Sequence, residues 1–182
     1  MKNPNLSSSS YVVLGLLAGN GPGTPYDLKR WVDGSIGYFW SFPRAQLYVE
    51  PARLATFGLL EEAREEAGRR RRVYSITEAG RRALQDWLRA GEPEPAELRD
   101  PGLLKLFFAG VVTREDVVAL ARAQETAHAR RLAEYERIEA TIAGDPRQAF
   151  ARATLRLGLV HEQTAVEFWR RVAEDPPRSM EA

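Results

Sequence analysis

The fold of this chain is decided by the stretch Gly37-Tyr38-Phe39-Trp40-Ser41-Phe42-Pro43-Arg44-Ala45-Gln46-Leu47-Tyr48 and by a second stretch, Arg69-Arg70-Arg71-Arg72-Val73-Tyr74-Ser75-Ile76-Thr77-Glu78-Ala79-Gly80. The first is typical of a loop that leads into a short helix with a polar outer face. The second is typical of the basic tip of a β-hairpin that runs directly into another helix. A recognition helix followed by a basic hairpin is the arrangement of a winged helix, which grips duplex DNA with both elements.

Residues 1–90 alternate between apolar periodic segments and turn residues in an order that predicts four helices and one hairpin. The expected elements, in chain order, are a helix over 9–18, a turn over 19–23, a helix from Thr24, a helix from Ser41 to Gly58, strands over 59–66 and 71–76, and a helix from Thr77. Pro51 lies inside the third helix, where a proline removes one backbone hydrogen bond and costs ~3 kcal/mol. We therefore expect this helix to kink after Gln46 or to divide.

Capping residues support several of these helix starts. Thr24, Pro25 and Asp27 form a capping box with proline in the first turn. Ser41, ahead of Pro43, is expected to open the third helix in the same way. Thr77 is expected to cap the helix that follows the hairpin.

The second half of the chain predicts a separate helical domain. Proline and glycine interrupt the pattern over residues 91–102, which are expected to form a linker. Beyond it we expect a short apolar helix over 103–109 and two long helices, one from Thr113 with Asp116 as its capping partner, the other from Asp145 to about 174. The fold class is therefore mainly α with a small β-hairpin wing: an N-terminal winged helix-turn-helix domain over 1–90, and a C-terminal long-helix domain over 103–182 that we expect to dimerise.

Charge is distributed unevenly between the two halves. Residues 1–90 hold 13 Lys and Arg against 9 Asp and Glu, whereas residues 91–182 hold 13 against 16. A basic first half joined to an acidic second half suggests that only the first meets a polyanion.

Several function classes find no support in the sequence. The chain has no cysteine, which excludes disulfides and thiolate metal sites, and it has only two histidines. His161-Glu162-Gln163-Thr164-Ala165 lacks the second histidine of a zinc-protease helix, and neither a glycine-flanked nucleophilic serine nor a phosphate-binding glycine loop occurs. We expect no enzyme, no metal and no cofactor. Tyr11 to Gly19 is interpreted as an amphipathic helix rather than an export signal, and no apolar stretch approaches the ~20 residues that span a bilayer. The expected location is cytoplasmic, without membrane contact.

The candidate DNA contacts lie in the two opening stretches. With Leu47 and Leu54 buried, the side chains of Arg44, Gln46 and Tyr48 can face outward. Arg44 can contact guanine or phosphate, Gln46 can pair with adenine, and the Tyr48 hydroxyl can donate to phosphate. Free amides near Ser41 would add a phosphate site. In the hairpin, the candidate phosphate contacts are Arg69, Arg70, Arg71 and Arg72. Alternation along the strand directs two of these arginines to one side, and the glutamates over 61–66 could pair with the others.

Residues 11–90 resemble the winged-helix domain of PadR-type bacterial transcriptional regulators. The resemblance is carried by Leu14-Gly15-Leu16-Leu17, Gly37-Tyr38-Phe39-Trp40, Gln46-Leu47-Tyr48, Arg53-Leu54, Gly58-Leu59-Leu60 and Arg72-Val73-Tyr74-Ser75-Ile76-Thr77-Glu78-Ala79-Gly80. The helices that contain Leu157-Gly158-Leu159 and Trp169 are similar to the dimerisation region of that family. Pro51 and Phe57 depart from the pattern, because the family usually has an ordinary helix former and an acidic residue at these positions.

The resemblance implies a sequence-specific transcriptional regulator: a homodimeric repressor that binds a roughly palindromic double-stranded operator and is released by a small aromatic or planar hydrophobic effector. His128, His161 and Trp169 are candidates for the effector pocket, and core or interface packing is the alternative role for each. Two other functions remain open. The chain could be a winged-helix protein-interaction module without specific DNA binding, which Pro51 and the acidic strand favour, or a dimer that sequesters a ligand.

Overall fold

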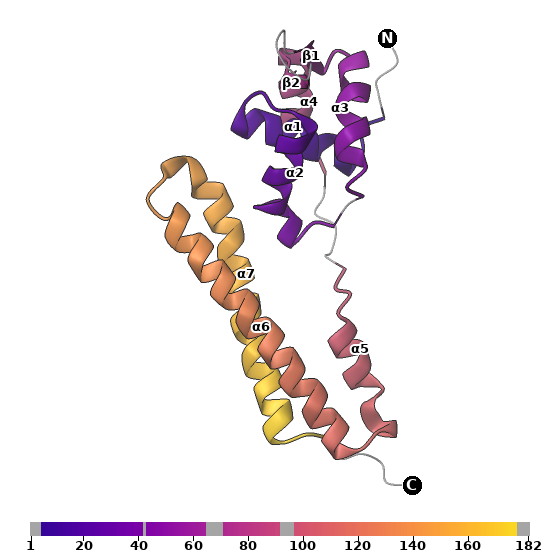
Figure 1. Ribbon diagram of the computed structural model, residues 1–182, viewed down its shortest axis with the longest axis vertical. Helices are drawn as coiled ribbons and strands as arrows, with labels where there is room; N and C mark the ends of the chain where they lie inside the picture. The colour runs from indigo at the N-terminus through magenta and orange to yellow at the C-terminus, as the bar shows by residue number, and fades with distance from the viewer. Residues whose placement is uncertain (1–4, 42, 65–70, 92–96, 178–182) are drawn as a thin grey trace. The chain divides into compact units, whose positions relative to one another are not determined.

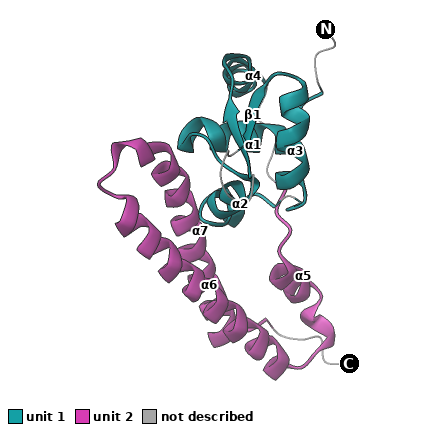
Figure 2. Ribbon diagram, turned by 45° about the horizontal axis from the view of Figure 1, so that its top comes forward, with its two compact units in different colours: residues 1–94 teal, residues 95–182 magenta. Residues whose placement is uncertain are grey.

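The computed structural model describes residues 5–41, 43–64, 71–91 and 97–177 (Figure 1). The chain divides into two compact units, which we call unit 1 (Met1–Glu94) and unit 2 (Pro95–Ala182) (Figure 2). Both are mainly helical, and unit 1 also contains an antiparallel hairpin, which confirms the predicted fold class.

Unit 1 contains the elements α1 (Ser8–Asn20), α2 (Pro25–Asp33), the 3-10 turn η1 (Ile36–Tyr38), α3 (Gln46–Thr56), β1 (Leu60–Arg64), β2 (Arg72–Ile76) and α4 (Glu78–Arg89). Helix α1 is apolar along much of its length and contributes Val13, Leu14 and Leu17 to the centre of the core. Each of the other helices contributes an apolar stripe to the same cluster, which also takes in Leu60 and Tyr74 from the hairpin. Apolar burial of this kind is the main force that assembles the unit.

The predicted caps of α2 and α4 are present. The backbone N–H of Asp27 donates to Thr24 Oγ1 at 3.2 Å, and the N–H of Thr24 donates back to the Asp27 carboxylate at 3.0 Å. Thr77 Oγ1 accepts from the N–H of Gly80 at 3.1 Å and donates to the carbonyl of Leu59 at 3.0 Å. Thr77 therefore both starts α4 and ties it to the residue before β1.

The expected start of the third helix is wrong. Helix α3 begins at Gln46 with Ala45 as its N-cap, and Ser41 lies exposed outside it. The N–H of Gln46 bonds to the carbonyl of Pro43 at 2.9 Å, so the first turn is built from Pro43 onward rather than from Ser41.

The expectation that Pro51 divides the helix is also wrong. Because α3 starts late, Pro51 lies in its second turn, and the helix runs without a break to Thr56. The ring of Pro51 is among the fully buried side chains of the chain. Its packing offsets the hydrogen bond that a proline cannot donate.

Strands β1 and β2 pair from Leu60 opposite Ile76 to Arg64 opposite Arg72. On its other edge β2 is bonded to the turn between α1 and α2, because Gly23 and Tyr74 exchange N–H to carbonyl bonds of 3.0 and 2.9 Å. A Cβ on Gly23 would lie 2.5 Å from the Trp31 ring, so a larger residue would require that ring to shift. The hairpin, which we call the wing, is therefore held by the helical part of unit 1.

Unit 2 contains α5 (Pro101–Phe107), the 3-10 turn η2 (Ala109–Val111), α6 (Arg114–Ile142), the 3-10 turn η3 (Pro146–Gln148) and α7 (Ala149–Glu174). Helices α6 and α7 run side by side in opposite directions (Figures 1 and 2). Their shared core consists of Val117, Ala121, Trp169, Val172 and Ala173. Thr113 and Asp116 cap α6 as predicted. The short helix starts at Pro101 rather than near Leu103, because the Asp100 carboxylate accepts from the N–H of Gly102 at 2.7 Å.

The predicted linker over 91–102 falls partly on residues 92–96, which lie outside the described residues. Within the described part of the chain, no helix is both long and apolar enough to cross a membrane. The same residues contain no group of three or more His, Asp or Glu side chains that could hold a metal ion.

Candidate nucleic-acid interface

Helix α3 has one buried and one exposed face. The side chains of Leu47, Glu50, Pro51 and Leu54 are buried at the spacing of a helical stripe. Tyr48 is 54% exposed, and Gln46, the first residue of the helix, is partly exposed. Gln46 and Tyr48 therefore flank the buried stripe on opposite sides of α3, near its N-terminal end.

Arg44 lies in the turn just before α3 and reaches back to α2. Its Nη1 is 2.8 Å from Oδ1 of Asp33, and the two side chains are 66% and 35% exposed. Hydrogen bonding from Lys29 and the charge of Arg44 together lower the pKa of Asp33. An exposed ion pair of this kind is worth only ~0–1 kcal/mol, so a phosphate or a guanine can replace Asp33 at little cost.

The two described arginines of the 69–72 run, Arg71 and Arg72, have different surroundings. Arg72 lies opposite Arg64, and its Nε is 3.4 Å from Oε1 of Glu62. The hydroxyl of Tyr74 donates to Glu62 at 3.1 Å. Burial raises the pKa of Tyr74, and the hydrogen bond to Tyr74 raises the pKa of Arg72. The charge of Arg72 is therefore partly balanced by the acidic strand, in line with the expected pairing between the glutamates over 61–66 and some of the arginines.

Arg71 is exposed just outside β2. Hydrogen bonds from Thr24 lower the pKa of Asp27 at the start of α2, and the charges of Arg30 and Arg71 add to this. Arg69 and Arg70 lie outside the described residues. Of the four predicted arginines, the structure thus describes two: Arg72, which is paired with Glu62, and Arg71, which is not.

The three candidate effector residues have different surroundings in unit 2. Trp169 is only 1% exposed and belongs to the core between α6 and α7. His128 Nδ1 lies 2.6 Å from Oε2 of the buried Glu162, and the ring of the exposed His161 lies 6.4 Å from that of His128. A groove of unit 2 lies against α5 and is lined by Leu104, Lys105, Phe108, Ala109, Val112, Asp116, Val117 and Leu120.

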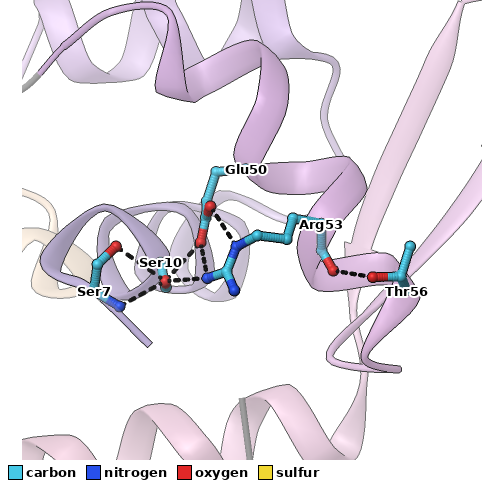
Figure 3. Close-up of polar contacts among 5 residues, drawn as sticks. All are labelled: Ser7, Ser10, Glu50, Arg53 and Thr56. Atoms are coloured by element: carbon cyan, nitrogen blue, oxygen red, sulfur yellow. Dashed lines mark hydrogen bonds and ion pairs between the residues drawn. The ribbon is translucent and has the colours of Figure 1, made fainter. Parts of the chain in front are cut away.

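A polar cluster that links α1 to α3 was not anticipated. It consists of Ser10, Glu50 and Arg53, with Ser7 beside it (Figure 3). The available signal was that Glu50 occupies a position of the buried stripe, between Leu47 and Leu54. A carboxylate at such a position needs a buried partner.

Acid is expected to weaken unit 1 through this cluster. Burial alone raises the pKa of Glu50, but the hydrogen bonds from Arg53 and Ser10 and the Arg53 charge more than offset it, so the pKa lies below its ordinary value. The ionised carboxylate therefore stabilises the fold above the unfolded pKa of about 4.3, and this contribution is lost as the pH falls through the lower folded value. Urea unfolding at pH 7 and below pH 4 should show that Glu50→Gln destabilises the chain less in acid. An effect of Glu50→Gln that does not change with pH would contradict this.

Two family models match most of the chain. Residues 13–86 match the transcriptional regulator PadR-like family, and residues 98–175 match the model described as virulence activator alpha C-term. A curated relative, the negative transcriptional regulator PadR of Bacillus subtilis (strain 168), is 29% identical over 116 residues, which are 63% of this chain and 63% of that protein. The match thus spans somewhat less than two thirds of that relative.

Solved structures share the fold over nearly their whole length. Bacillus subtilis PadR in complex with operator DNA has a TM-score of 0.80 at 24% identity, covering 91% of this chain and 96% of that one. Its complex with p-coumaric acid has a TM-score of 0.75 at 21% identity, covering 92% and 96%. The Vibrio cholerae virulence activator AphA has a TM-score of 0.69 at 29% identity, covering 92% and 97%. Unit 1 is thus similar to the PadR-like family of transcriptional regulators over residues 13–86, and unit 2 is similar to the C-terminal part of virulence activators over residues 98–175.

Proposed function

We propose that the protein is a sequence-specific DNA-binding repressor that acts as a homodimer in the cytoplasm. The observation that carries this is the exposed N-terminal end of α3, where Arg44, Gln46 and Tyr48 follow one another in the same unit as the wing. A helix of this kind enters the major groove, and a wing contacts the phosphate backbone. The operator complex of the Bacillus subtilis relative supports the assignment, because its fold is the same.

The exposed side chains of unit 2 support dimerisation. Phe107, Val111 and Phe150 are 81%, 91% and 90% exposed, and Leu157 on α7 is 73% exposed. These large apolar side chains lie on α5, η2 and α7, and a second copy of the chain is the occupant proposed for them. A two-fold dimer presents two α3 helices, which calls for an inverted repeat with half-sites about one duplex turn apart.

Release by a small aromatic effector is part of the same proposal. It is supported by the p-coumaric acid complex of the Bacillus subtilis relative. His128 and His161, whose rings are neighbours, remain candidate contacts, whereas the burial of Trp169 favours its role in packing.

Activation of transcription is the second candidate. It is favoured by the match of residues 98–175 to the virulence-activator model and by the likeness to AphA. A promoter reporter that carries the selected operator separates the two, because a repressor lowers expression and an activator raises it.

The test of DNA binding is selection of bound sequences from a random duplex pool, followed by titration at two salt concentrations. An enriched inverted repeat supports the dimeric regulator. The absence of enrichment, with only weak salt-sensitive binding, would contradict it and favour a protein-interaction module.

Replacing Arg44 with alanine should weaken operator binding by roughly tenfold or more and relax the preference at one base position, since a good base contact is worth about 1–3 kcal/mol. The measurement is titration of the selected operator and of its single-base variants. Arg82→Ala is the matched control, because Arg82 is also ion-paired and its side chain is 63% exposed, but on α4. Equal effects of the two substitutions would remove Arg44 from the contacts that read sequence.

Arg71→Ala and Arg72→Ala should differ in the salt dependence of duplex binding. Loss of one phosphate contact lowers the slope of log affinity against log salt by about 0.9. We expect this for Arg71, and a smaller change for Arg72, because Glu62 already holds its guanidinium. Titrations over a salt series measure both slopes. A larger change for Arg72 would show that DNA displaces Glu62, so that the Arg72–Glu62 pair of the free protein does not prevent Arg72 from contacting a phosphate.

A further inference from the structure

The polar cluster between α1 and α3 is closely bonded. Arg53 Nε donates to Oε2 of Glu50 at 2.9 Å, and Nη2 donates to Oε1 at 2.7 Å. The same Nη2 lies 3.0 Å from the hydroxyl of Ser10, and that hydroxyl donates to Glu50 Oε1 at 2.6 Å (Figure 3). Two residues of α3 and one of α1 therefore share a single set of charge-assisted bonds, which are stronger than neutral ones.

The Ser10 hydroxyl has its full set of partners. It donates to Glu50 and accepts from Arg53, and it also accepts from the backbone N–H of Ser7 at 2.9 Å, at the start of α1. A hydroxyl offers one donor and two acceptor positions, so all three are used. Ser10 is fully buried and Glu50 is 3% exposed. The cluster thus joins the first turn of α1 to the middle of α3.

The hydrogen bonds of this cluster fix the rotation of α3 about its own axis, which apolar packing alone does not fix. Leu47 and Leu54 hold α3 against the core, but apolar burial has no preferred direction. Hydrogen bonds weaken steeply when their angles change, so rotation of α3 about its axis would break the two bonds that Ser10 makes with Glu50 and Arg53. Gln46 and Tyr48 belong to the same helix, so the directions in which their side chains point depend on that rotation.

Arg53 is held away from a role in reading bases. Its Nε and Nη2 are occupied by Glu50 and Ser10, and its guanidinium carbon lies 5.4 Å from the centre of the Phe57 ring. A bidentate contact to guanine would require Arg53 to abandon a buried carboxylate, and an uncompensated buried charge is strongly destabilising. Phe57 and Arg53 thus form a local pair on the last turn of α3.

We propose that Glu50 and Arg53 are positioning residues, which with Ser10 set the rotation of α3 on α1 and thereby determine operator affinity without touching DNA. This rests on the proposed function, because it assigns how the recognition helix is aimed. Affinity for an operator depends on that aim, whereas affinity for unrelated duplex depends on the phosphate contacts of the surface.

The test uses the full chain and three variants, Glu50→Gln, Arg53→Met and the double variant, each titrated against the selected operator and a scrambled duplex. Melting monitored by near-ultraviolet circular dichroism confirms that each is folded at the assay temperature. Either single substitution should weaken operator binding by about tenfold, a loss equal to one strong interaction. Scrambled-duplex affinity should not fall, and the double variant should be no weaker than the single ones, because the residues act as one unit.

Two milder variants keep the proposal testable if the others unfold. Ser10→Ala leaves the Glu50–Arg53 pair in place but removes both bonds that join it to α1, so it should also reduce operator affinity by about tenfold. Arg53→Lys should restore part of what Arg53→Met loses, because it returns the charge without the planar fork.

Several results would overturn the proposal. If Arg53→Met relaxed the preference at one base while Glu50→Gln left operator binding unchanged or tighter, Arg53 would be a base contact. Equal losses of affinity for the operator and for the scrambled duplex, or no loss for either, would show that the cluster has only a structural role. If the unaltered chain selected no operator, the proposed function itself would fail, a result distinct from any of these.

Discussion

Replacing Gly80 with alanine is expected to destabilise unit 1 by about 3 kcal/mol, at the upper end of the cost of overpacking a core. A Cβ at this position would lie 2.2 Å from the carbonyl oxygen of Leu59 and 2.9 Å from the side chain of Ile76. The Leu59 oxygen cannot retreat easily, because it accepts from both the N–H and the hydroxyl of Thr77. The start of α4, the capping residue and the start of the wing would therefore shift together.

The measurement is urea unfolding of the full chain, and Gly15→Ala is the control. Nothing lies within 4 Å of a Cβ added to Gly15, which is inside α1. Removing a helix-interior glycine should raise stability by about 0.5–1 kcal/mol, because glycine is the more costly residue to order. Equal stability of the two variants would show that the junction of Gly80, Leu59 and Thr77 adjusts freely.

Trp169→Ala should destabilise unit 2 by about 3–5 kcal/mol, the usual cost of emptying a large aromatic site in a core. Trp169 is the largest fully buried side chain and packs with Val117 and Ala121 of α6. Because few buried residues hold α6 to α7, we expect loss of helical circular dichroism at lower urea concentrations.

His161→Ala is the comparison for Trp169, because His161 is exposed on the same helix. It should leave the unfolding curve within about 0.5 kcal/mol of the original, as surface substitutions usually do. A Trp169→Ala chain that kept its stability but lost the response to aromatic compounds would contradict the packing role and return Trp169 to the effector pocket.

Helix starts that depend on local chemistry could be predicted from the sequence. Thr24 with Asp27 and Thr113 with Asp116 need only four neighbouring residues to form a capping box, and both boxes are present. Ser41 ahead of Pro43 has the same appearance, yet the helix starts at Gln46. A local pattern cannot decide between two possible first turns when the packing of Leu47 selects the register.

The polar surroundings of the site depend on contacts between distant residues. Ser10 and Glu50 are 40 positions apart, and nothing near Ser10 in the sequence sets it apart from the serines before it. Likewise, the basic character of the wing could be predicted, whereas the pairing of Arg72 with Glu62 depends on the strand register. The sequence thus identifies the residue types of the interface, and tertiary contacts decide which charges are free.

Each unit has its own apolar core, one built from α1 to α4 with the wing and the other from α5 to α7. In evolutionary terms, the surface of α3 can diverge toward a new operator while the residues that pack α6 on α7 stay under separate selection. Gene fusion or recombination near residue 94 could then pair an established DNA reader with a different partner-binding half.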